Sequence, residues 1–118
     1  MKSKLLFLLL GLTQILAAQI FTEKAGTPFE GVYDGSVAFS DVDRDGDKDA
    51  LIVSNKPGFG IEAFAKLYEN DGRGNFIEDA EVLFDPVQSA TIAFSDVDND
   101  GDEDVIIAGY EIDSLGAV

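Results

Sequence analysis

The residues best suited to chemistry are aspartates in two clusters of identical spacing. Each cluster places aspartates at positions 1, 3, 5 and 9 of a nine-residue segment, with glycine at position 6. The side-chain ligands that this spacing predicts are Asp41, Asp43, Asp45 and Asp49 in the first segment and Asp96, Asp98, Asp100 and Asp104 in the second. Alternate carboxylates in a tight loop can turn inward on a common centre, and Gly46 and Gly101 permit the positive φ that folds such a loop. The pattern therefore predicts a cation held by oxygen ligands in each loop.

Calcium is the ion that these donors suit best, which gives two Ca²⁺ sites. The backbone carbonyls of Asp47 and Asp102, at position 7, are expected to add one donor each, and water can complete six or seven oxygens at about 2.3–2.6 Å. Without a cation, four inward carboxylates would repel one another at short range. The chain has no Cys and no His, so softer metals lack their preferred ligands. Mg²⁺ is an alternative, although it takes fewer protein ligands in a stricter geometry.

The spacing also separates these loops from the EF-hand type. An EF-hand loop needs a bidentate Glu at position 12, where this chain has Ile52 and Ile107. A solvated acidic turn that binds nothing is the simplest alternative. It does not account for the glycine at position 6 or for apolar Val42 and Val97 at position 2, which occur in both segments.

The two clusters belong to a repeat with an offset of 55 residues. Residues 38–49 and 93–104 differ only at Arg44/Asn99 and Lys48/Glu103. The register extends backwards without a gap, so that 16 of the 34 positions in 21–54 and 76–109 are identical. Such self-similarity is typical of a repeat architecture.

Each unit has an all-β pattern. Short apolar runs at 36–40, 50–53, 63–69 and 76–78 predict four strands, and residues 70–75 have the Asp-Gly and Gly chemistry of a hairpin loop. Four short strands in about 55 residues suit one blade of a β-propeller. Phenylalanines recur at equivalent strand positions and are expected to form the core between blades: Phe21, Phe39, Phe76, Phe84 and Phe94.

The segment 41–49, its copy at 96–104 and the hairpin 67–76 together resemble FG-GAP/VCBS-type repeats, the calcium-binding blades of integrin α-chain-like β-propellers and of many exported bacterial proteins. The resemblance implies one to two four-stranded blades of an incomplete propeller, with calcium between the first two strands of each blade. It also implies the eight aspartate ligands already named. Gly35-Ser36 and Val53-Ser54-Asn55 stand where the integrin-like version has its Phe-Gly and Gly-Ala-Pro signatures, which favours the bacterial exported subtype.

The N-terminus has the layout of a secretory signal peptide. Lys2 and Lys4 precede a 12-residue apolar stretch, 5–16, and Ala17-Ala18-Gln19 supplies small residues at the cleavage point. We therefore expect a signal peptide at 1–18, a secreted or cell-surface protein, and no membrane insertion after cleavage. An uncleaved anchor is the alternative, although a comfortable span needs about 20 residues.

The repeat region, 19–118, holds one unit at 21–75 and a truncated second unit at 76–118. A propeller typically has about 4–8 blades, so the sequence predicts either a fragment of a larger propeller protein or a subunit that closes a ring. Its partners would then be further repeats of the same chain or copies of itself, together with an unidentified extracellular protein or carbohydrate ligand.

The amino-acid composition excludes several classes of active site and of ligand. The chain has 8 basic and 23 acidic residues, a formal charge of −15, and no His or Cys. This excludes a Ser–His–Asp triad and a thiolate site, and it opposes nucleic-acid binding. We expect a non-catalytic binding, adhesion or scaffold module, with no catalytic residue. The alternatives are the propeller segment of an extracellular polysaccharide-active enzyme and a calcium-dependent docking module.

Overall fold

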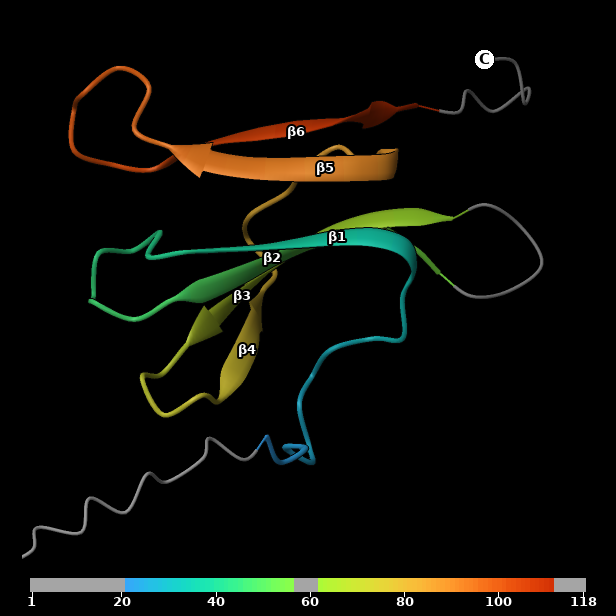
Figure 1. The fold of residues 1–118 in the computed structure, drawn as a ribbon, viewed down its shortest axis with the longest axis horizontal. Helices are drawn as coiled ribbons and strands as arrows, with labels where there is room; N and C mark the ends of the chain where they lie inside the picture. Colours follow the sequence, from blue (N-terminus) through green and yellow to red (C-terminus); the bar gives the residue numbers. More distant parts are fainter. Residues whose placement is uncertain (1–20, 57–61, 112–118) are drawn as a thin grey trace, which may run out of the picture.

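The computed structural model describes residues 21–56 and 62–111, so the expected signal peptide at 1–18 lies outside the described residues. The described residues form six strands (Figure 1): β1 Tyr33–Ser40, β2 Asp49–Asn55, β3 Ala63–Asn70, β4 Phe76–Asp79, β5 Gln88–Ser95 and β6 Asp104–Tyr110. The described ranges contain no helix, and hence none that is long and apolar enough to cross a membrane.

The first unit is a four-stranded antiparallel meander in the order β1-β2-β3-β4. Gly72 and Gly74 form the tight connection between β3 and β4. Their φ values are 73° and 75°, which glycine adopts readily because it has no Cβ. The second unit contributes the antiparallel pair β5-β6. The all-β prediction is confirmed, with one complete four-stranded sheet and the first two strands of a second.

The repeat is structural as well as sequential. Ala38 pairs with Leu51 across β1 and β2, and Ala93 pairs with Ile106 across β5 and β6, which is the same register moved by 55 residues. Both first strands also carry an irregularity near their start, where Asp34 and Ser89 have positive φ values of 53° and 48°. Each unit therefore builds the same ribbon from the same positions.

The two sheets lie face to face, with β5 beside β1 (Figure 1). Because side chains alternate along a strand, β2 and β3 turn Leu51, Val53 and Leu67 toward the second sheet, and these three are buried. The second unit packs eight apolar side chains against them: Val82, Phe84, Val87, Ala90, Ile92, Phe94, Val105 and Ile107. This layer between the sheets is the core.

The expectation that all five recurring phenylalanines form the core between blades is wrong for three of them. Phe84 and Phe94 pack against the core, but Phe21 and Phe39 are 88% and 57% exposed. Phe76 is half-buried and packs on Phe29, with ring centroids 5.0 Å apart, and not in the core between the sheets. Phe39 lies on the face of β1 that is turned away from the second sheet. The same strand position is thus covered in one unit and open in the other.

Candidate metal centre

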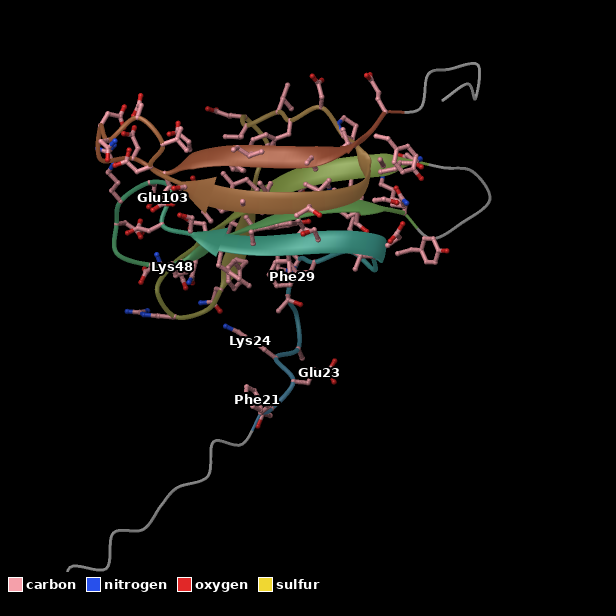
Figure 2. All side chains as sticks on the ribbon, turned by 45° about the horizontal axis from the view of Figure 1, so that its top comes forward. Phe21, Glu23, Lys24, Phe29, Lys48 and Glu103 are labelled. Carbon is pink, nitrogen blue, oxygen red and sulfur yellow. The ribbon has the colours of Figure 1, made fainter. Side chains whose placement is uncertain are left out.

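Both acidic loops connect two adjacent antiparallel strands. The first runs from the end of β1 to the start of β2, and the second joins β5 to β6 in the same way. Lys48 and Glu103 hold the same position in the two loops and lie at the same end of the molecule (Figure 2).

The loop backbone adopts left-handed conformations at two positions in each unit. Gly46 and Gly101 have φ values of 98° and 97°, as their place in the spacing predicts. Arg44 and Asn99, with φ values of 65° and 62°, do the same at position 4. A positive φ is uncommon for a residue with a Cβ, and the arginine side chain gave no indication of it. These turns curl the chain around the aspartates.

Three carboxylates converge in the first loop. Asp41, Asp43 and Asp49 each place an oxygen within 4.8 Å of the others. Backbone N–H groups orient them: Gly46 donates to Asp41 Oδ2 at 3.0 Å, Asp45 donates to Asp43 Oδ1 at 3.1 Å, and Val42 donates to Asp49 Oδ2 at 3.0 Å. The loop therefore fixes the carboxylates through its own backbone.

The second loop reproduces this arrangement. Asp96, Asp98 and Asp104 also place oxygens within 4.8 Å of one another. Gly101 donates to Asp96 Oδ2 and Val97 donates to Asp104 Oδ2, both at 3.0 Å. Duplication of the same hydrogen bonds shows that the loop geometry belongs to the repeat.

The other predicted side-chain ligands, Asp45 and Asp100, do not converge with the three carboxylates of their loops. Each accepts the N–H of the residue two positions on, at 2.9 Å from Asp47 and 3.1 Å from Asp102. The Asp47 side chain lies against the β3–β4 hairpin at Gly72. The backbone carbonyls of Asp47 and Asp102 remain predicted ligands.

The donor set fits a hard cation. All side-chain donors are carboxylate oxygens, and Asp41 Oδ1 is buried without a hydrogen-bond partner among the described residues. A buried polar atom of this kind is costly unless something pairs with it. The pKa of Asp43 is raised above its usual value. The hydrogen bond from the Asp45 N–H lowers this pKa, but desolvation and the charges of the neighbouring aspartates together raise it more. The loop thus holds excess negative charge that a dication would neutralise.

The two loops differ in the hydrogen bonds that connect them to the neighbouring strands. Asp49 is 1% exposed, and its Oδ1 accepts the Asn70 N–H from the end of β3 at 2.9 Å. The Asn70 side chain also donates to the Lys48 carbonyl at 3.1 Å. Asp104 is exposed, and no described residue of the second unit takes the place of Asn70. The first loop is therefore tied to its sheet more closely than the second.

One ion pair connects the loops directly. The Arg44 guanidinium contacts Asp102 Oδ1, and both side chains are about half exposed. In the second loop Asn99 takes the position of Arg44 and has no charge with which to form an equivalent pair.

The family model described as FG-GAP-like repeat matches residues 41–107, from the first loop aspartate into β6. The comparisons with curated proteins and with solved structures find no match.

Proposed function

Because the chain belongs to the FG-GAP-like repeat family, we propose that it is an exported, calcium-binding β-propeller-type module with a non-catalytic binding, adhesion or scaffold role. One observation carries the proposal: the same three-carboxylate cluster recurs in both loops, at the same positions of the repeat.

Calcium fits the chemistry of each cluster. In the first loop Asp41, Asp43 and Asp49 would hold the ion directly, and Asp45 and the Asp47 carbonyl would complete the set. The second loop would use Asp96, Asp98 and Asp104, with Asp100 and the Asp102 carbonyl. Three or four carboxylates and no nitrogen or sulfur donor suit Ca²⁺ better than Mg²⁺ or a transition metal. The ion would supply the positive charge that lets each turn close.

An ion held in each loop would stabilise the fold. Asp41 directly follows β1 and Asp49 begins β2, so one cation would bridge the ends of two paired strands. In the first unit the Asn70–Asp49 hydrogen bond extends the connection to β3. A structural role follows, because these carboxylates would be occupied by the metal and not free for proton transfer.

The extracellular location and the bacterial VCBS-type subtype are part of the proposal. The N-terminal pattern at 1–18 supports export, and the residues at 35–36 and 53–55 support the subtype. Extracellular calcium modules bind with dissociation constants of about 10⁻⁴–10⁻³ M, and we expect affinities in that range.

Isothermal titration tests the metal assignment. We expect residues 19–118 to bind two Ca²⁺, with Mg²⁺ binding at least tenfold more weakly. Asp41→Asn and Asp96→Asn should each remove one equivalent, and the double variant should remove both. Asp85→Asn, at an exposed aspartate outside the loops, is the matched control. Calcium binding that survives the double substitution would refute the assignment.

A further inference from the structure

The face of the first sheet turned away from the second carries an open apolar groove. Its volume is about 270 Å³. We call it the groove face, and its apolar lining consists of Phe29, Val32, Val37, Phe39, Ala50 and Ile52. Val32, Val37 and Phe39 are exposed.

The repeat shows what covers a face of this kind. Moving each lining residue by 55 positions gives Phe84, Val87, Ile92, Phe94, Val105 and Ile107. These six residues are all packed against Leu51, Val53 and Leu67 between the two sheets. The groove face of the second unit is therefore closed by the opposite face of the first unit.

Part of the matching surface, the part that β5-β6 and its loop carry, is also open. The second-unit equivalents of Leu51, Val53 and Val42 are Ile106, Ala108 and Val97, which lie on the far side of β5-β6. We call this surface the outer face. Ile106 and Val97 are 59% and 61% exposed, whereas Leu51 is fully buried. The described residues thus carry an open groove face and part of an open outer face, the two kinds of surface that meet between the sheets.

We propose that two copies of this chain associate head to tail, the outer face of one copy packing into the groove face of the next. Burial of exposed aliphatic and aromatic side chains would drive the association. The contact is heterologous, because two different surfaces meet, so it extends to further copies or closes into a ring.

A polar contact in the internal junction predicts how the copies are oriented. Arg44 of the first unit reaches Asp102 of the second. At the junction between copies the equivalent positions hold Asn99 and the partner's Asp47, so this ion pair is absent there. Asn99→Arg would restore it if the copies stack as the two sheets do.

Sedimentation velocity on residues 19–118, which include every described residue, tests the proposal. In excess Ca²⁺, from about 10 μM to about 1 mM, association should rise with concentration. Val37→Lys alters only the groove face and Ile106→Lys only the outer face, and each should weaken self-association at least tenfold by burying an unpaired charge. Ile77→Lys, on the exposed side of β4 and outside both faces, is the matched control and should behave as the wild type.

Mixing the two defective variants distinguishes head-to-tail from symmetric contact. Val37→Lys retains its outer face and Ile106→Lys retains its groove, so the mixture should form a heterodimer that grows no further. A wild type that stays monomeric at about 1 mM, a single variant that still associates normally, or a mixture that stays monomeric would each overturn the proposal.

Asn99→Arg provides a test that leaves both apolar faces unchanged. An added surface ion pair should tighten association by up to about fivefold and lose that gain in high salt. Association unchanged at low salt would contradict the proposed orientation. Circular dichroism on every variant confirms the β-sheet before association is compared.

Discussion

Asp49 and Asn70 join the first acidic loop to the third strand: the Asn70 N–H donates to Asp49 Oδ1 at 2.9 Å, while Asp49 Oδ2 accepts the Val42 N–H at 3.0 Å. Both oxygens of one buried carboxylate are thus in use. Asp104, its repeat equivalent, accepts only the Val97 N–H among the described residues and is exposed. Two aspartates of the same motif therefore have different structural roles.

This difference predicts unequal effects of the same substitution. Asp49→Asn leaves one partly buried N–H without an acceptor, because an amide presents one oxygen where the carboxylate presented two. We expect a loss of about 1.5–3 kcal/mol in the free energy of unfolding. Asp104→Asn should lose about 1 kcal/mol or less, since water can replace the missing contact. Urea unfolding in excess chelator measures both without a contribution from bound metal, and equal losses would contradict the prediction.

Calcium removal should lower thermal stability substantially. At a free Ca²⁺ concentration of ten times Kd, each occupied site adds about 1.4 kcal/mol. For a domain of this size 1 kcal/mol corresponds to about 4–8 °C in Tm, so two sites correspond to a shift of roughly 10–20 °C. Differential scanning calorimetry at one fixed protein concentration, with Ca²⁺ and with chelator, measures the shift. The Asp41→Asn/Asp96→Asn double variant should have the same Tm in both buffers.

The strands and loops could be predicted because their signals are local. β2 and β3 are runs of branched and aromatic residues between turn residues, and the glycine at position 6 has the positive φ that its spacing requires. The duplication then placed the second loop without further information. Three of the four predicted side-chain ligands in each loop converge, as alternation around a tight turn leads one to expect.

What could not be predicted depends on neighbours in space. Phe39 and Phe94 occupy identical sequence contexts, yet one is exposed and the other packed, because only the second faces another sheet. The contact of Asn70 with Asp49 joins residues 21 positions apart and involves a backbone group that no residue type reveals. The left-handed conformation of Arg44 is imposed by the loop and not by the arginine itself.

Arg44 should couple the two loops weakly. Arg44→Asn copies the residue that the second loop has at this position and removes the ion pair with Asp102. Because both side chains are about half exposed, we expect a loss of at most about 1 kcal/mol in the free energy of unfolding. Solvent ions screen such a pair, so the difference from wild type should disappear in high salt. A loss that persists at high salt would point to packing of the arginine stem instead.

Tyr68 should make the fold sensitive to alkali. Its side chain is fully buried edge-on to Phe29, with ring centroids 5.1 Å apart, and its hydroxyl has no hydrogen-bond partner among the described residues. Burial raises the pKa of Tyr68, and nearby Glu78 adds to the effect although Lys66 opposes it. The unfolded chain has the ordinary tyrosine pKa of about 10. The neutral side chain therefore contributes its full stability below about pH 10 and loses it as the pH rises through the folded pKa.

Ultraviolet absorbance of tyrosinate measures this directly. Of the three tyrosines, Tyr33 and Tyr110 are exposed and Tyr68 is buried. Tyr68 should ionise together with loss of the β-sheet circular dichroism signal, because its raised pKa favours the neutral form in the folded chain. Tyr68→Phe keeps the ring and removes the unpaired hydroxyl, so its stability at neutral pH should equal or exceed that of wild type by up to about 1 kcal/mol. It should also unfold at a higher pH than wild type. Ionisation of Tyr68 while the β-sheet signal persists would show that its hydroxyl is accessible to water.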